Sequence, residues 1–201
     1  MYCLEVCMVV AVLSSIYGNA HGQSIGMGSC PHVTVKDNFE PVKYTGRWYE
    51  YSRIINTFQL GGSCVTADYT PEIDSNNEFT GNILVKNSMI NWRGKTSSIG
   101  GKAVPLDKST NDAKYIVIFK NVPTNGSYWV VDTDYESYSV VYSCTSIFGL
   151  FNLKFLWLLT RTPEPTQYVI ERMNSVLETN GLSSYLLSKT NQKNCKYIEL
   201  S

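Results

Sequence analysis

Eight short runs rich in Val, Ile, Tyr, Phe and Trp follow Gly46, and clusters of turn-forming residues separate them. Runs of this kind indicate β-strands in an all-β sandwich or barrel. The predicted strands are 47–55, 63–70, 79–87, 91–103, 114–121, 127–134, 137–145 and 154–161. Eight consecutive strands favour a closed antiparallel up-and-down barrel, because closure removes the sheet edges and leaves an interior that can hold one small ligand.

After two prolines the apolar residues change to a spacing of about 3.6, which predicts an amphipathic helix. The residues on its apolar face are Tyr168, Val169, Met173, Val176 and Leu177. Thr166 is the expected N-cap, and Asn180 and Gly181 form the expected C-cap. We expect this helix to pack outside the barrel and to cover outward-facing residues such as Ile116 and Ile118.

The first twenty residues have the pattern of a targeting segment. An apolar run over 6–16 is followed by Gly18 and Ala20, small residues spaced as a cleavage site requires. The run is shorter than the roughly 20 apolar residues of a membrane anchor, the alternative interpretation. We therefore expect a secretory signal peptide over 1–20, a single domain over 21–201, and a secreted, extracellular protein.

Four cysteines follow the signal segment: Cys30, Cys64, Cys144 and Cys195. An even number in an oxidising compartment predicts two disulfides, and three pairings are compatible with the sequence. The spacings are wide and include no C-x-x-C, which argues against a metal site or a redox motif.

Several function classes lack their required residues. Lys plus Arg and Asp plus Glu both number 17, so no excess of cations is available to neutralise the phosphates of a nucleic acid. Histidine occurs only at His21 and His32, so triad hydrolysis, a His-rich zinc site and histidine-ligated haem have no central residue. Asp132 and Asp134 lie two apart on one predicted strand, as on a solvated face. We expect no enzymatic activity and no metal.

Three segments, in order, resemble the signatures of the lipocalin family. The first is 38–50, with Gly46 and Trp48; the second comprises 133–135 and 138–144; the third is 155–163. Four further motifs are similar to the apolipoprotein D-like branch, which includes insect bilin-binding proteins. They are Cys30-Pro31, Gly62-Ser63-Cys64, Asp134-Tyr135-Glu136-Ser137-Tyr138 and Val141-Tyr142-Ser143-Cys144.

The resemblance implies an eight-stranded lipocalin barrel with one C-terminal helix outside it. Trp48 would close the narrow end, with the Arg161 guanidinium over its ring, and Gly46 would let the backbone bend into the strand. These three roles are structural, and no catalytic residue is implied. The branch also implies the disulfides Cys30–Cys144 and Cys64–Cys195.

The resemblance also implies a ligand pocket on the inner face of the barrel, with two residues at its rim. The inner residues are Ala67, Tyr69, Asn87, Met89, Ile99, Val117, Phe119, Val141, Ser143, Phe155 and Trp157, and the rim residues are Asn56 and Phe58. Any one of them could instead pack a filled barrel core. Tyr69, Asn87 and Ser143 could bond a ligand's polar end, but no inward cation is evident and the partner of Glu50 is not identified.

The preferred function is that of a carrier that transports or sequesters a small hydrophobic ligand. The ligand could be a lipid, a sterol, a retinoid-like compound or a biliverdin-type tetrapyrrole, and no cofactor is required. The sequence does not choose between pigment and lipid. The alternative is a surface-interaction protein that acts on membranes or lipoproteins.

Two features of the predicted open end bear on partners. The segment 147–151 carries Ile147, Phe148, Leu150 and Phe151, which could make transient membrane or lipoprotein contact or could fold inward as a lid. Asn125 is in the only N-glycosylation sequon of the chain, although Asn-Gly is also a good turn former.

Overall fold

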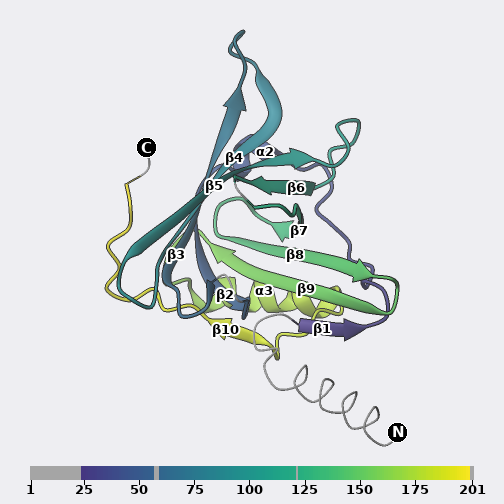
Figure 1. The fold of residues 1–201 in the computed structure, drawn as a ribbon, viewed down its shortest axis with the longest axis vertical. Helices are drawn as coiled ribbons and strands as arrows, with labels where there is room; N and C mark the ends of the chain where they lie inside the picture. Colours follow the sequence, from purple (N-terminus) through teal and green to yellow (C-terminus); the bar gives the residue numbers. More distant parts are fainter. Residues whose placement is uncertain (1–23, 57–58, 121, 200–201) are drawn as a thin grey trace, which may run out of the picture.

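The computed structural model describes residues 24–56, 59–120 and 122–199, so the predicted signal peptide lies outside the described residues. Eight antiparallel strands form a closed barrel in which each strand pairs with the next (Figure 1). They are β2 (Gly46–Ile54), β3 (Ser63–Ile73), β4 (Phe79–Ile90), β5 (Thr96–Pro105), β6 (Lys114–Phe119), β7 (Gly126–Thr133), β8 (Tyr138–Ile147) and β9 (Phe151–Thr160). The sheet closes where β9 pairs with β2, from Tyr49 opposite Thr160 to Arg53 opposite Trp157. The predicted all-β barrel is confirmed.

Two short strands that the sequence did not predict complete the wall. β1 (Ser24–Met27) pairs with β9, and β10 (Leu187–Lys189) pairs with the upper part of β2. β1 lies along Phe151–Lys154 of β9, a part of that strand that does not pair with β2. β10 lies beside β2, whose own pairing with β3 ends at Tyr49 opposite Thr66. Segments of three and four residues are too short to show a periodicity, so only the fold reveals them.

The predicted helix is present as α3 (Gln167–Thr179), with the Thr166 hydroxyl accepting a hydrogen bond from the Val169 N–H. Its buried residues pack against outward side chains of β8 and β9 such as Val140 and Leu158. The expectation that it covers Ile116 and Ile118 is wrong, because Ile118 on β6 is 44% exposed. The short connection from the end of β9 holds the helix over the neighbouring strands, behind the barrel in Figure 1.

Trp48 and Arg161 close the narrow end of the barrel beside α2 (Pro41–Tyr44). The Trp48 side chain is fully buried, and the Arg161 guanidinium carbon lies 3.6 Å from the centre of its ring. The same guanidinium donates hydrogen bonds of 2.9 Å to the carbonyls of Thr45, Arg47 and Tyr135. Arg161 thus links the start of β2 and the turn after β7 to the closed end of the barrel.

Gly46, the first residue of β2, lies against the Arg161 guanidinium. Its φ is +93°, and a Cβ added there would come within 3.3 Å of Arg161 Nη1. A side chain would therefore be strained by the backbone and crowded by the arginine. The structural roles expected for Gly46, Trp48 and Arg161 fit this arrangement.

Both disulfides join a terminal segment to the barrel, and both pairings implied by the family resemblance are present. Cys30–Cys144 fixes the N-terminal arm to β8, and Cys64–Cys195 fixes the C-terminal tail to the start of β3. The chain segments that β1 and β10 belong to are therefore covalently anchored beside the strands that they complete.

The arginine at the closed end should be irreplaceable by lysine. We expect Arg161→Lys to lower the free energy of unfolding by about 2–3 kcal/mol, because an ammonium group cannot reproduce the planar fork that reaches three carbonyls. Urea denaturation measures the change. The control is Arg93→Lys, an exposed position, and an equal loss in both variants would contradict the assigned role of Arg161.

Candidate functional site inside the barrel

The inner face of the barrel divides into a buried lower zone and an accessible upper zone. Near the closed end, Tyr69 and Val117 are buried in one cluster with other inward side chains. Farther up, Ala67, Phe119 and Trp157 pack against this cluster but are only partly buried. Inward residues of a closed barrel are accessible only if its interior is open, so solvent reaches them from the end away from α2. We call this end, formed by the β2–β3, β4–β5, β6–β7 and β8–β9 loops, the open end.

The strand registers bring most of the predicted pocket residues onto one inner surface. Asn87 lies opposite both Ala67 and Ile99. On the far wall, Val141 lies opposite Trp157 and Ser143 opposite Phe155. Directly opposed residues point to the same side of a sheet, so these side chains share the inner face. Phe155 and Trp157 stack there with ring centres 5.7 Å apart.

Two of the predicted residues, Met89 and Ile99, lie at the upper margin of this surface. Met89 Sδ is close to the β2–β3 loop, since a Cβ built on Gly62 would approach it to 2.8 Å. Ile99 is partly exposed near the open end, and Phe58 lies outside the described residues. Asn56 is fully buried, so its description as a rim residue needs correction.

A chain of four hydroxyl groups forms the floor of the interior. Tyr69 and Tyr128 hydroxyls are 2.9 Å apart, Tyr128 and Tyr44 2.9 Å, and Tyr44 and Ser139 2.8 Å. Burial raises the pKa of Tyr44 to about 12, and desolvation also raises the pKa values of Tyr69 and Tyr128. The phenols are therefore neutral at physiological pH, which makes the floor polar but uncharged. Only Tyr69 was predicted; alternation along 126–130 would have indicated Tyr128.

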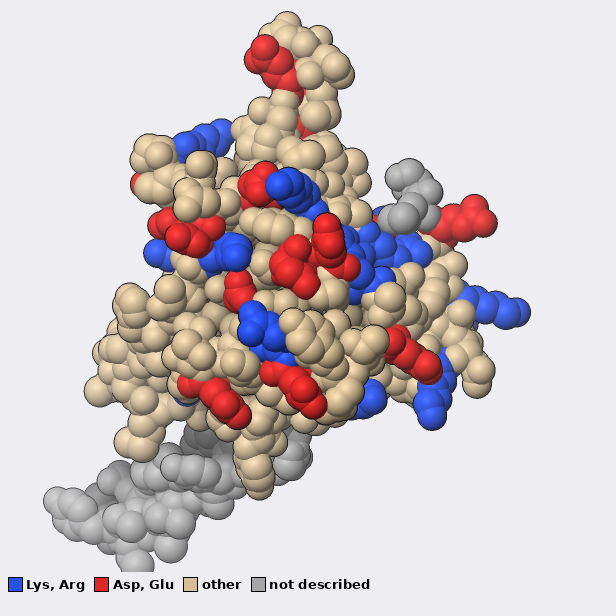
Figure 2. Space-filling view, turned by 180° about the vertical axis from the view of Figure 1, so that it is seen from behind, with Lys and Arg blue, Asp and Glu red and all other residues tan. Residues whose placement is uncertain are grey.

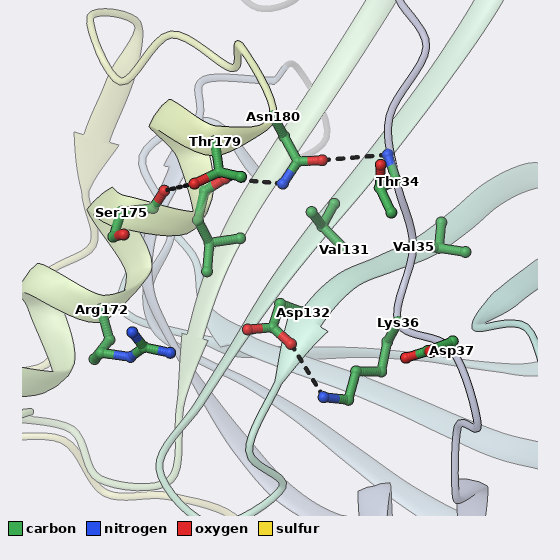
Figure 3. Close-up of a pocket in the computed structure, with 11 residues that line it drawn as sticks. Thr34, Val35, Lys36, Asp37, Val131, Asp132, Arg172, Ser175, Thr179 and Asn180 are labelled. Atoms are coloured by element: carbon green, nitrogen blue, oxygen red, sulfur yellow. Dashed lines mark hydrogen bonds and ion pairs between the residues drawn. The ribbon is translucent and has the colours of Figure 1, made fainter.

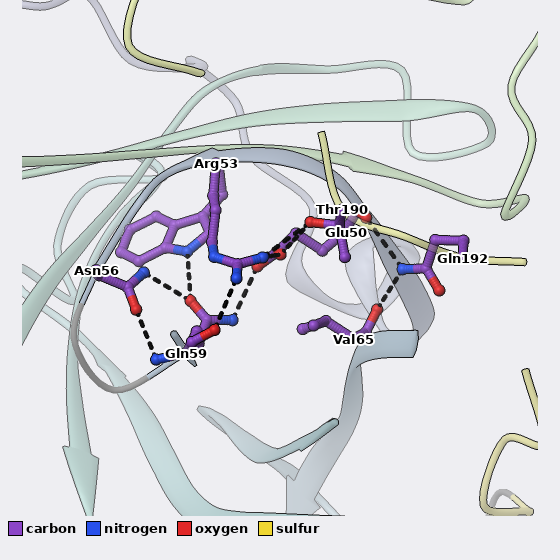
Figure 4. Close-up of polar contacts among 8 residues, drawn as sticks. Glu50, Arg53, Asn56, Gln59, Val65, Thr190 and Gln192 are labelled. Atoms are coloured by element: carbon purple, nitrogen blue, oxygen red, sulfur yellow. Dashed lines mark hydrogen bonds and ion pairs between the residues drawn. The ribbon is translucent and has the colours of Figure 1, made fainter. Parts of the chain in front are cut away.

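The interior also holds a buried ion pair that the sequence analysis did not find (Figure 4). Arg53 Nη1 donates to Glu50 Oε1, and both side chains are almost wholly buried. The Thr190 hydroxyl accepts from Arg53 Nη1 at 2.9 Å and donates to Glu50 Oε1. Arg53 is thus the partner of Glu50 and an inward cation. A β-bulge between Glu50 and Ser52 changes the alternation of β2, which is why the strand pattern hid it.

Gln59 connects this ion pair to the aromatic wall. Its side-chain nitrogen donates to Glu50 Oε2 at 2.8 Å, and its backbone carbonyl accepts from Arg53 Nη2 at 2.7 Å. Its side-chain oxygen accepts from Asn56 at 2.7 Å and from Trp157 Nε1 at 3.4 Å. Glu50 and Arg53 neutralise each other, so the upper interior combines aromatic surface with polar groups and has no net charge. Arg53 Nε and Asn87 Oδ1 are buried without a hydrogen-bond partner.

Residues of the C-terminal tail fill the gap between β2 and β3. Gln192 Nε2 donates to the carbonyls of Glu50 at 3.0 Å and Val65 at 2.8 Å (Figure 4). Cys64 N–H donates to the Asn191 carbonyl at 2.8 Å. These bonds replace the β2–β3 ladder above Tyr49 and bring Thr190 to the ion pair.

Asp132 on β7 and Asp134 just after it make structural contacts outside the barrel. Asp132 is partly buried and accepts from the Tyr138 hydroxyl at 2.6 Å and from Lys36 at 3.3 Å. Asp134 accepts backbone N–H groups of the following turn, including Ser137 at 2.8 Å. Both residues lie on the outer face of the barrel, where Asp132 is partly buried by its partners and Asp134 is exposed. In the described part of the chain, no three His, Cys, Asp or Glu residues are grouped to hold a metal.

A surface pocket of about 420 Å³ lies beside Asp132, between the N-terminal arm, β7 and α3 (Figure 3). Its polar groups bond one another: Asn180 Oδ1 accepts from Thr34 N–H at 3.2 Å, and Lys36 pairs with Asp132. None of the predicted pocket residues lines it. We interpret it as the seam where the arm meets the helix.

The ion pair can be tested by removing one partner. We expect Arg53→Met to lower the free energy of unfolding by about 3–5 kcal/mol, because Glu50 would stay buried without its counter-charge. Adding Glu50→Gln to this variant should restore much of the loss, as followed by urea denaturation. If the double variant were no more stable than Arg53→Met, the coupling between the two side chains would be refuted.

Comparison with known proteins gives the same fold and a relationship by sequence. The Lipocalin-like domain family model matches residues 40–192. Apolipoprotein D of Bos taurus is 35% identical over 192 residues, covering 96% of this chain and 97% of that protein. Lazarillo protein of Schistocerca americana is 33% identical over 166 residues, covering 81% of this chain and 74% of that protein.

Solved structures agree. Insecticyanin from the tobacco hornworm Manduca sexta superposes with a TM-score of 0.76 at 22% identity, covering 86% of this chain and 91% of that one. Apocrustacyanin C2 gives a TM-score of 0.69 at 17% identity, covering 85% and 92%. With the family model spanning three quarters of its length and the barrel closed as described, this chain belongs to the lipocalin family and is similar to apolipoprotein D.

Proposed function

We propose that this lipocalin is a secreted carrier that binds a small hydrophobic ligand inside its barrel. The observation that carries the proposal is the partly accessible aromatic and aliphatic inner face above an uncharged floor. Such a surface favours an apolar molecule with few polar groups. Two disulfides suit an oxidising compartment, and no helix in the described part of the chain is long and apolar enough to span a membrane.

The proposed ligands are a lipid, a sterol, a retinoid-like compound or a biliverdin-type tetrapyrrole. Asn87 Oδ1 has no hydrogen-bond partner among the described residues and is the group we propose for a ligand's polar end. The hydroxyls of Tyr69 and Ser143 already bond those of Tyr128 and Ser127, each at 2.9 Å. The test is purification from the native source, followed by an absorption spectrum and mass spectrometry of the solvent extract. Visible absorbance would identify a pigment carrier, a colourless lipid extract a lipid carrier, and an empty barrel would contradict the proposal.

We propose a carrier and not an enzyme. All four cysteines of the described chain are in disulfides, so none of them can serve as a cavity nucleophile. The tyrosines of the floor have raised pKa values, which disfavours the phenolate form that a base would need. N-glycosylation of exposed Asn125, at the end of the β6–β7 loop, stays a prediction that mass spectrometry of glycopeptides can test.

Trp157 is the side chain that best separates binding from folding. We expect Trp157→Ala to weaken ligand binding by about 1–3 kcal/mol, since a large aromatic contact is lost. Titration with retinol, followed by tryptophan fluorescence, measures the affinity. Trp157→Phe, which keeps a ring, should bind better than Trp157→Ala. Trp48→Ala should instead lower stability and affect intrinsic affinity less; reversed effects would refute the placement of pocket and floor.

The β8–β9 turn supports a second candidate function, contact with a lipid surface. Phe148 is 95% exposed, and Phe148 and Gly149 are the central residues of the β-turn 147–150, with φ of +51° and +70°. Such turns favour Asn-Gly, so a phenylalanine is strained there as well as exposed. Ile147 lies opposite Phe151 on the face that carries Phe155 and Trp157, so alternation places this pair at the mouth. Thus only Phe148 and Leu150 extend outward.

Substitution of Phe148 should therefore raise the stability of the protein while it weakens contact with lipid. We expect Phe148→Asn to raise the free energy of unfolding by about 0.5–1 kcal/mol, because asparagine tolerates positive φ. Co-sedimentation with lipid vesicles should fall, and retinol affinity in solution should hold. Phe151→Ser serves as the comparison at the mouth. If Phe148→Asn reduced retinol affinity and spared co-sedimentation, the turn would be a lid.

A further inference from the structure

Charge is segregated between the two ends of this barrel, although the whole chain is neutral. The open-end segments 55–62, 91–95, 120–125 and 147–151 contain Arg93, Lys95 and Lys120 and no Asp or Glu. The closed-end loops 74–78, 106–113 and 134–137 contain six carboxylates and one cation, Lys108. The carboxylates are Asp74, Glu78, Asp107, Asp112, Asp134 and Glu136. The loops at one end thus sum to +3 and those at the other to 1 − 6 = −5.

The rest of the surface does not share this separation. Figure 2 shows red carboxylates on the projecting β3–β4 hairpin and, over the face below it, carboxylates mixed with blue cations. Lys43, Lys102 and Lys114 each form an ion pair with a neighbouring acidic residue. In the described part of the chain, Arg93, Lys95 and Lys120 form none. Their charge is therefore available to an external partner.

The β4–β5 hairpin presents its cations on a fixed framework. Asn91 Oδ1 accepts from the backbone N–H groups of Arg93 at 3.0 Å and Lys95 at 3.1 Å, which holds the turn. Trp92 of the same turn is 71% exposed, with the Arg93 guanidinium 4.5 Å from its ring centre. A cation held against an exposed indole suits the boundary between lipid headgroups and acyl chains.

Apolar side chains of the neighbouring loops extend this surface. A Cβ on Gly61 would lie 3.2 Å from Trp92 Cβ, so the β2–β3 and β4–β5 loops touch, and the adjacent Leu60 is largely exposed. Val122 on the β6–β7 loop and Phe148 on the β8–β9 turn are also exposed. All four open-end loops therefore offer an apolar side chain, and two of them add unpaired cations.

We propose that the open end docks onto an anionic phospholipid surface. Trp92, Leu60 and Phe148 enter the interfacial layer, while Arg93, Lys95 and Lys120 contact lipid phosphates and carboxylates. A bilayer is the occupant because its chemistry matches both halves of the surface, apolar and cationic. The acidic closed end is repelled by the same surface, so the molecule is oriented with its mouth toward the lipid. This inference extends the second candidate function from lipid surfaces in general to anionic ones.

Vesicle co-sedimentation tests the proposal with the mature protein. Asn125 lies on the loop that carries Lys120, so all proteins are enzymatically deglycosylated first. Binding is compared on phosphatidylcholine vesicles and on equimolar phosphatidylcholine–phosphatidylserine vesicles. The test variant is Arg93→Gln/Lys95→Gln/Lys120→Gln, and Lys43→Gln/Lys108→Gln/Lys114→Gln, at the closed end, has the same change in charge. Retinol affinity in solution is measured for each protein.

We expect the unchanged protein to prefer the anionic vesicles and to lose that preference at high salt. The open-end variant should bind anionic vesicles about 100-fold more weakly, since each cation near such a surface contributes roughly fivefold. The closed-end variant should match the unchanged protein. Equal binding to both vesicles, or equal losses in both variants, would overturn the proposal. If the protein bound vesicles but not retinol, only the carrier pocket would be contradicted. If it bound retinol but not vesicles, only the docking would be contradicted.

Discussion

The structure depends on how β2 closes the sheet. β2 pairs with β9 along its upper part but with β3 only up to Tyr49, because the bulge after Glu50 turns it away. A barrel with this gap would expose unpaired backbone groups and an open edge. The C-terminal tail supplies the missing partners through Thr190 and Gln192, and its disulfide to Cys64 keeps it there. The C-terminal tail thus forms the part of the barrel wall between β2 and β3.

The same gap explains why a buried ion pair is tolerated in an apolar interior. Taking Glu50 and Arg53 out of water costs several kcal/mol per ion unless their remaining hydrogen-bonding groups are satisfied. Thr190 from the tail and Gln59 from the β2–β3 loop supply those bonds. The ion pair therefore holds together three segments that no continuous ladder joins, and it orients Trp157 through Gln59.

Structural elements with a regular residue pattern, and those that match a family motif, could be predicted from the sequence. Runs of β-forming residues bounded by turn clusters located eight strands, and helical spacing located α3. The motifs around Trp48 and Arg161 supplied the closed end, and the family resemblance supplied the disulfide pairing. Features that depend on a departure from periodicity were missed: β1, β10, the bulge that turns Arg53 inward, and the position of α3 away from Ile118. Tyr128 was within reach of the alternation argument, whereas Gln59 and Thr190 were not, because only the fold brings a loop and a tail to Glu50.

The net charge of this molecule does not describe how its charges are distributed, either inside the barrel or on its surface. Inside, the charge of Arg53 in the upper interior is cancelled by Glu50, and burial raises the pKa values of the floor tyrosines, so the hydroxyl floor stays neutral. An ionised ligand would therefore find no unpaired counter-charge among the described inward residues, which favours ligands that are neutral when bound. Outside, a neutral total hides a cationic open end and an acidic closed end. In the docking proposed above, a neutral interior behind a cationic mouth would suit exchange of an uncharged molecule with a charged lipid surface, because the surface would hold the protein while the ligand itself feels little of the field.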